Sequence, residues 1–126
     1  IDEKGNTLDR IIAARAVSDY EVLLRRNPGN STVVYDAEVL GKYRIPQIKK
    51  RNDYVMWLQV IKKARYLYGL QETLGSHRVR PGSLSSNKAS LVYYHWKVYN
   101  QMEGLSVIKS AYLVCYWVIA TFFKLR

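Results

Sequence analysis

The stretch from Asp53 to Ala64 constrains the fold more than any other part of this sequence. Its large apolar side chains recur at the i, i+3, i+4 and i+7 spacing of one helical face, at Tyr54, Trp57, Leu58 and Ile61. Asn52 is a good N-cap, and lysines at positions 62 and 63 complement the negative end of a helix dipole. The pattern predicts a helix over residues 53–64 that buries an apolar stripe.

The other segments predict strands interleaved with helices. In chain order they are a short helix capped by Ser18, a buried strand at 31–35, a loop with one helical turn at 36–51, strands at 66–70 and 74–79, and helices at 87–102 and 105–124. This mixed order predicts an α/β fold.

The net charge of +10 is concentrated in the later part of the chain. Residues 1–38 carry five Lys/Arg and seven Asp/Glu, residues 39–53 carry five and one, and residues 54–126 carry ten and two. A basic surface suits polyanionic partners, such as nucleic acid, a diphosphate or an anionic membrane leaflet. Solubility alone explains the same charge, so the charge narrows the class of partner without choosing one.

The termini and the cysteine content limit the class of protein further. The single cysteine, Cys115, excludes an internal disulfide and a cysteine-rich metal site, and its apolar surroundings predict a buried free thiol. The chain starts at Ile1 without the pattern of a signal peptide, so we expect it to begin within a longer protein.

Asp53 is the first candidate for chemistry. It stands in the first turn of the predicted helix, directly after the cations Lys49, Lys50 and Arg51. A carboxylate fixed in this way has what a general base needs, although acids at helix starts more often only complement the dipole.

The loop from His77 to Lys88 is the second candidate. Two arginines, Arg78 and Arg80, precede a Gly/Ser-rich turn that opens a predicted helix. Guanidinium groups, hydroxyls and backbone amides that converge there would form an anion site suited to a diphosphate, and a solvated basic loop is an equally good interpretation. His77 and His95 are too far apart in sequence to favour a two-histidine metal site.

These two stretches resemble the paired motifs of family 2 glycosyltransferases. Asn52-Asp53-Tyr54 followed by Trp57-Leu58 resembles the signature [E/D]-D-Y-x-x-W-L, and residues 77–85 resemble the later loop Y-R-x-H-x-x-S-x-S. Residues 27–35 are similar to the strand that precedes the acidic signature in bacterial members. The resemblance covers about residues 1–100 and implies the C-terminal, acceptor-side portion of a GT-A-like nucleotide-sugar transferase domain.

The resemblance also implies a role for each matching residue. Asp53 matches the catalytic base, and Asn52 and Trp57 fall on the acceptor side, with Trp57 more often a core residue than a sugar platform. The residues expected to lie over the donor diphosphate are Arg78, Arg80, Ser83 and Ser85. Asn52 stands where relatives usually have an acid, and Arg80 where many have a metal-binding histidine.

No residue of this chain is expected to bind a metal. The Asp-x-Asp motif and the nucleotide-binding acids of the family are expected before Ile1, and no Asp-x-Asp occurs in the sequence. The resemblance therefore implies a divalent ion, Mg²⁺ or Mn²⁺, whose ligands lie outside this chain. We expect the chain alone to bind nucleotide sugar weakly or not at all.

The apolar segment after Gly104 is expected to form a helix of its own. We divide the chain into residues 1–103, the catalytic-domain portion, and residues 104–126, an amphipathic, membrane-proximal helix. Its uninterrupted apolar run is shorter than the ~20 residues that span a bilayer. Tyr112, Tyr116 and Trp117, with basic residues at the end, suit a helix lying on an anionic leaflet, and a packed C-terminal helix fits equally well. Tyr93, Tyr94, Trp96 and Tyr99 would extend the same aromatic face.

The resemblance predicts an inverting transfer of a sugar from a nucleotide-sugar donor to a glycan or lipid-linked acceptor, in cell-surface polysaccharide synthesis. The expected location is cytoplasmic, at the inner face of the plasma membrane. Two alternatives stay open: a basic, aromatic-rich module that binds nucleic acid, and a non-catalytic protein of the membrane surface. No nucleic-acid motif occurs in the sequence, so nucleic acid is not the expected partner.

Overall fold

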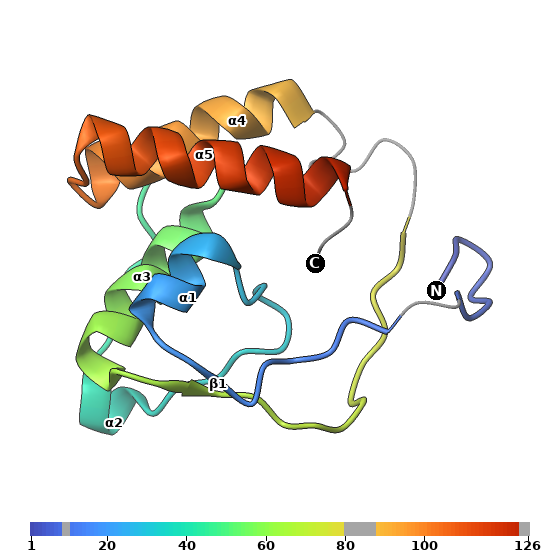
Figure 1. The fold of residues 1–126 in the computed structure, drawn as a ribbon. Coiled ribbons are helices and arrows are strands. Elements are labelled where there is room, and N and C mark those ends of the chain that lie inside the picture. Colours follow the sequence, from blue (N-terminus) through green and yellow to red (C-terminus); the bar gives the residue numbers. More distant parts are fainter. Residues whose placement is uncertain (9–10, 80–87, 124–126) are drawn as a thin grey trace.

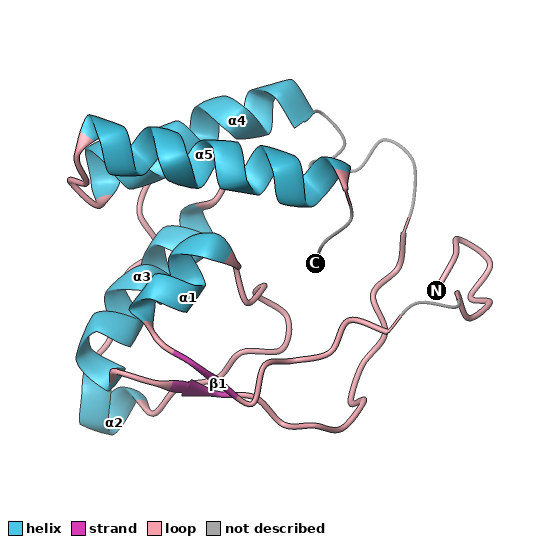
Figure 2. Ribbon diagram, viewed as in Figure 1, coloured by secondary structure: helices cyan, strands magenta, loops and turns pink. Residues whose placement is uncertain are grey.

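A computed structural model describes residues 1–8, 11–79 and 88–123. The elements are β1 (Val17–Ser18), α1 (Tyr20–Arg25), α2 (Ala37–Leu40), α3 (Asn52–Ala64), β2 (Leu67–Tyr68), α4 (Lys88–Trp96), the π-helix η1 (Lys97–Met102) and α5 (Val107–Phe122). Helices α4 and α5 lie side by side and form one layer, and α1 and α3 form the next, with the small sheet beyond them (Figure 1). Long loops join these elements (Figure 2). The mixed helix-and-strand class is confirmed, with helices dominant.

Helix α3 is the centre of the hydrophobic core. Seven of its thirteen residues are buried: Tyr54, Val55, Met56, Trp57, Leu58, Val60 and Ile61. Buried side chains from α1, η1 and α5 pack around it, among them Leu24, Val98 and Leu113. The predicted helix is therefore confirmed, and it buries a wider face than the predicted stripe. Asn52 is its first helical residue, and Arg51 occupies the cap position with a left-handed φ of 65°.

Two buried tyrosine hydroxyls join α3 and η1 to the end of α1. The Tyr54 hydroxyl donates to the backbone oxygens of Leu23 and Leu24, at 2.8 and 3.0 Å, and the Tyr99 hydroxyl donates to the Leu24 oxygen at 2.8 Å. The last carbonyls of any helix lack partners within the helix, and a six-residue helix has few others. The tyrosines therefore satisfy backbone groups whose burial would otherwise be costly.

Glu103 forms a second buried polar contact. Its carboxylate lies 2.6 Å from Lys62 Nζ and accepts a hydrogen bond from the Tyr20 hydroxyl, while its side chain is only 1% exposed. The ammonium group of Lys62 also lies 5.2 Å from the centre of the Tyr20 ring. One acid thus connects α1, α3 and the segment after η1.

The two strands pair antiparallel, with Val17 opposite Tyr68 and Ser18 opposite Leu67. Gly69 continues the pairing by donating to the Ala16 oxygen at 3.0 Å. A Cβ at Gly69 would lie 2.3 Å from the Arg15 oxygen, so only glycine fits this approach.

Several strand predictions are wrong. Residues 31–35 form a turn and a loop rather than a buried strand, and Val34 is 90% exposed. Among the described residues no segment pairs with 31–35, and an extended segment without a ladder partner does not form a strand. Of the predicted strand 66–70 only Leu67–Tyr68 is a strand, and 74–79 contains none.

The predicted helices are present, but one predicted helix cap and the predicted burial of Cys115 are wrong. Asp19, not Ser18, caps α1, because its carboxylate accepts from the Val22 amide at 2.9 Å while Ser18 belongs to β1. The one helical turn expected in 36–51 is α2, and the helix expected at 87–102 corresponds to α4 and η1. Cys115 is exposed rather than buried, since it lies on the outward face of α5.

Helix α5 confirms the last predicted helix and packs one face on the rest of the molecule. Ser106 caps it, and its buried residues are Ser110, Leu113, Trp117 and Ala120. Trp117 is therefore a packing residue and not part of an outward aromatic face, and the same correction applies to Tyr99, which is 1% exposed. No helix in the described parts of the chain is long and apolar enough to cross a membrane.

The buried Glu103 contact predicts unequal effects for two acid substitutions. Glu103→Ala should lower the free energy of unfolding by about 2–3 kcal/mol, because a buried, charge-assisted hydrogen bond is lost. Glu21→Ala removes an exposed pair with Lys109 and should cost about 0.5 kcal/mol or less. Urea denaturation of both variants measures the difference, and equal losses would contradict the assignment.

The tyrosines at the α1 contacts predict a loss of stability in alkali. Burial and the neighbouring Glu103 raise the pKa of Tyr20 above its ordinary value of 10.0, and burial raises the pKa of Tyr54 well above it. Above about pH 10 the unfolded chain loses phenol protons that the folded chain keeps, so stability falls as pH rises. Urea midpoints at increasing pH should show this fall, and Tyr20→Phe should make it shallower. A fall of the same size in both proteins would refute the role of Tyr20.

Candidate active site

Asp53 is held at the first turn of α3 by the local backbone. The Asn52 side-chain oxygen accepts from the Asp53 amide at 2.9 Å, and the Val55 amide donates to the Arg51 oxygen at 3.1 Å to close the first turn. Asp53 is half-buried. The predicted position of this acid is thus confirmed, while its chemical role stays a prediction.

Arg51 places a cation beside this acid. Burial lowers the pKa of Arg51, and the charge of Asp53 opposes that shift by favouring the guanidinium ion. The guanidinium carbon lies 6.0 Å from the centre of the Trp117 ring, and its buried Nε has no hydrogen-bond partner among the described residues. An arginine remains charged under such conditions, so Asp53 faces a fixed positive charge.

The loop before α3 is also anchored from the other side. Lys50 Nζ donates to the Ser90 hydroxyl of α4 at 2.7 Å. The basic cluster Lys49-Lys50-Arg51 is therefore joined to the α4–α5 layer through two of its members. This fixes the direction from which the chain enters α3.

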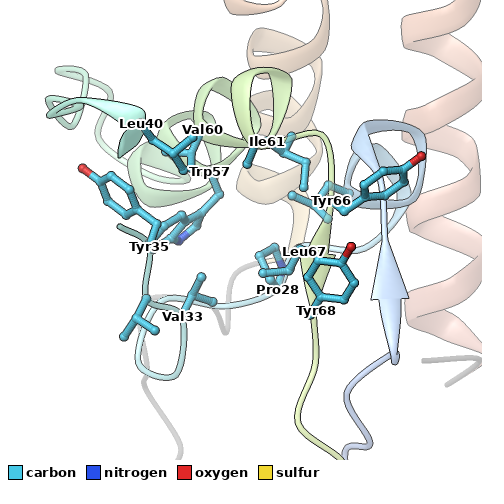
Figure 3. A pocket seen from close by; sticks show the side chains of 13 residues that line it. Pro28, Val33, Tyr35, Leu40, Trp57, Val60, Ile61, Tyr66, Leu67 and Tyr68 are labelled. Atoms are coloured by element: carbon cyan, nitrogen blue, oxygen red, sulfur yellow. The ribbon is translucent and has the colours of Figure 1, made fainter. Parts of the chain in front are cut away.

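An aromatic cavity of about 260 Å³ lies along the next turns of α3. Figure 3 shows Trp57, Val60 and Ile61 pointing into it from the helix, with Pro28, Leu67 and Tyr68 on the other side. The rings of Tyr35 and Trp57 meet edge to face, with centroids 6.0 Å apart. Its volume suits a small group such as one sugar ring.

Asp53 and the cavity lie on one side of α3. Trp57, Val60 and Ala64 follow Asp53 at i+4, i+7 and i+11, so all four share a helical face. Asp53 does not line the cavity itself and lies one turn, about 5 Å, before it along the helix axis. A carboxylate one helical turn from a cavity, on the same helix face, can serve as a base for a molecule that extends beyond the cavity toward it.

The donor-side residues are not brought to Asp53 by any described contact. The Arg78 guanidinium donates to the backbone oxygens of Asp2 and Glu3, at 3.3 and 2.5 Å, so it binds the N-terminal turn. Arg80, Ser83 and Ser85 lie outside the described residues. Their proposed role over the donor stays a prediction.

The histidines and acids of the described residues do not form a metal site. No group of three or more His, Cys, Asp or Glu side chains there could hold an ion. His95 is instead a core residue, with Nδ1 3.2 Å from the Tyr99 hydroxyl and its ring 4.4 Å from that of Trp117.

Sequence reasoning missed three aromatic residues of the site. Tyr35, Tyr66 and Tyr68 line the cavity with Trp57; Tyr35 comes from the loop before α2, and Tyr66 and Tyr68 come from the segment that forms β2. No pattern in the sequence links these two segments, so only the packing brings them together. The one signal in the sequence was their type, because large aromatic side chains interrupt otherwise polar connecting segments.

Comparison with known proteins gives two curated relatives. TuaG of Bacillus subtilis, named as a teichuronic acid biosynthesis glycosyltransferase, is 33% identical over 111 residues, which cover 87% of this chain and 44% of that protein. An uncharacterized glycosyltransferase of Haemophilus influenzae is 30% identical over 132 residues, which cover 99% of this chain and 50% of the relative. No protein-family model matches the sequence, and no solved structure matches it significantly.

The chain spans about half the length of the curated relatives it matches. Both relatives are named glycosyltransferases, and the alignments run over nearly all of this chain, including the Asp53 segment. The sequence is therefore similar, along most of its length, to part of a glycosyltransferase.

Proposed function

We propose that this chain is the acceptor-side portion of an inverting, family 2 glycosyltransferase of the GT-A type. The observation that carries the proposal is Asp53, fixed in the first turn of α3 beside Arg51 and in line with the aromatic cavity. The similarity to two named glycosyltransferases supports the class of reaction. The donor is a nucleotide sugar, and the acceptor is a glycan or lipid-linked sugar of cell-surface polysaccharide synthesis.

In the proposed reaction Asp53 accepts the proton of an acceptor hydroxyl. The oxygen attacks the anomeric carbon of the donor sugar as the bond from that carbon to the nucleotide diphosphate breaks, so the diphosphate leaves with the bonding electrons. One displacement inverts the configuration at that carbon. Arg51 keeps a positive charge near the carboxylate and so favours its ionised form.

A divalent ion, Mg²⁺ or Mn²⁺, would neutralise the diphosphate in the complete enzyme. The described residues offer no ligand set for such an ion. We therefore assign the metal ligands to residues beyond this chain and, from this chain, Arg78, Arg80, Ser83 and Ser85 to the donor diphosphate. We also propose a cytoplasmic location at the inner face of the plasma membrane, because nucleotide-sugar donors are cytoplasmic.

Nucleotide release by the complete protein that carries this chain tests the base. Over a panel of nucleotide sugars and acceptors, Asp53→Asn should lower acceptor-dependent release by about 100-fold or more, because the proton acceptor is lost. Asp36→Asn is the matched control, since Asp36 is an exposed acid that only caps α2. It should keep its activity, because asparagine caps helices equally well. Full release by the Asp53 variant would reject this residue as the base.

We take the aromatic cavity as the acceptor subsite, which predicts a kinetic effect different from that of Asp53→Asn. Tyr68 is 73% exposed and lines the cavity, so Tyr68→Ala should raise the KM for the acceptor about fivefold while kcat and stability change little. Tyr93→Ala, at another exposed tyrosine on α4, should change neither constant. If both variants behave alike, the cavity is not the acceptor subsite.

A further inference from the structure

The outward face of α5 is entirely apolar or aromatic. The exposed residues on the helix and at its C-cap are Val107, Ile108, Ala111, Tyr112, Cys115, Tyr116, Ile119, Phe122 and Phe123. At 100° per residue they cover half of the helix circumference without one charged side chain. Ile108 is 84% exposed and Phe122 75%.

The polar residues of α5 lie on the opposite side. Ser110 is fully buried, the Thr121 hydroxyl is buried, and Lys109 lies at the boundary of the two faces, where it pairs with Glu21 at 2.7 Å. Helix α5 thus has apolar residues on both sides, whereas a surface helix usually has a polar outer face. An apolar face of this size marks a contact surface.

The part of the sequence that carries this face has an excess of positive charge. Residues 88–126 contain five Lys/Arg, and Glu103 is their one acidic residue. The Glu103 carboxylate is buried against Lys62 and Tyr20 and presents no charge to the outside. Glu21, which reaches the edge of the layer from α1, is paired with Lys109.

We propose that the outward face of α5 binds an anionic membrane leaflet. The helix lies in the plane of the interface, with its isoleucines and phenylalanines among the acyl chains and the hydroxyls of Tyr112 and Tyr116 at headgroup level. The net positive charge of residues 88–126 adds attraction to anionic headgroups. The same net charge disfavours a second copy of this chain as the occupant, because it would bring like charges together.

Cys115 provides a reporter in the middle of this face. It is the chain's single cysteine and is exposed, so a thiol-reactive, polarity-sensitive fluorophore can be attached there alone. Vesicles of phosphatidylcholine with phosphatidylglycerol should shift its emission to the blue, and vesicles of phosphatidylcholine alone should do so far less. The control carries the fluorophore at Ile11→Cys in a Cys115→Ser background. This site is 83% exposed outside α5, and its emission should not shift.

Two matched double variants distinguish binding through the outward face of α5 from nonspecific hydrophobic binding. Ile108→Ser with Ile119→Ser removes isoleucines that are 84% and 51% exposed, and Ile11→Ser with Ile45→Ser removes isoleucines that are 83% and 51% exposed. Co-sedimentation with the anionic vesicles should fall about tenfold or more for the first pair and stay unchanged for the second.

Three results would overturn the proposal. The first is absence of binding to anionic vesicles by the unmodified chain. The second is equal loss of binding in the two double variants. The third is a concentration-dependent dimer that the Ile108→Ser, Ile119→Ser pair abolishes, since a second copy would then cover this face.

Discussion

The burial of the α1 carbonyl groups governs the rest of this structure. Helix α1 is too short to satisfy its own end, and it lies where water cannot reach the Leu23 and Leu24 oxygens. Tyr54 and Tyr99, from elements 31 and 75 residues further along the chain, both donate to the Leu24 oxygen, and Tyr54 also donates to the Leu23 oxygen, which accepts from the Arg26 amide as well. Hydrogen bonds are directional, so these contacts restrict how α3 and η1 sit against α1. Apolar packing alone would tolerate a rotation of α3 about its axis, because buried apolar residues occur on nearly all of its faces. The directional hydrogen bonds of the tyrosines do not tolerate such a rotation.

The orientation of Asp53 is a consequence of this constraint. Neighbouring residues on a helix point about 100° apart, so a Tyr54 side chain held toward α1 leaves Asp53 directed away from it. The carboxylate therefore shares its face with Trp57, Val60 and Ala64, which carry the aromatic cavity. The left-handed Arg51 before the helix adds the second condition, because it brings the chain into α3 with its guanidinium group beside the acid. Folding energy and site geometry thus depend on the same turn of the same helix.

The fold of a segment could be predicted from the sequence where the segment contains its own backbone hydrogen-bond partners. Helices close their hydrogen bonds locally, so the spacing of Tyr54, Trp57 and Leu58 was enough to place α3, and the Gly104 break was enough to place α5. Strands depend on distant partners, so the β-branched run 31–35 predicted a ladder that no described segment provides. Within the site, Asp53 could be predicted from the sequence because of its position in a motif. The tyrosines of the cavity could not be predicted, because they come from two separate segments, at residue 35 and at residues 66–68, that only the packing brings together. Cys115 was misjudged for a related reason: apolar neighbours in sequence indicate burial only if the helix face they share points inward.

Helix α5 confirms the packing interpretation of the apolar C-terminal segment, and its outward face leaves the membrane interpretation as a proposal. Leu113, Trp117 and Ala120 pack inward as in any core helix, while the opposite half presents isoleucine, tyrosine and phenylalanine to the outside. Packing within the described residues buries one half of the helix surface and leaves the other half exposed. A helix whose outer face met only water would usually place polar side chains there. In the proposed membrane contact the outer medium is less polar than water, and the net positive charge of residues 88–126 would favour an anionic boundary.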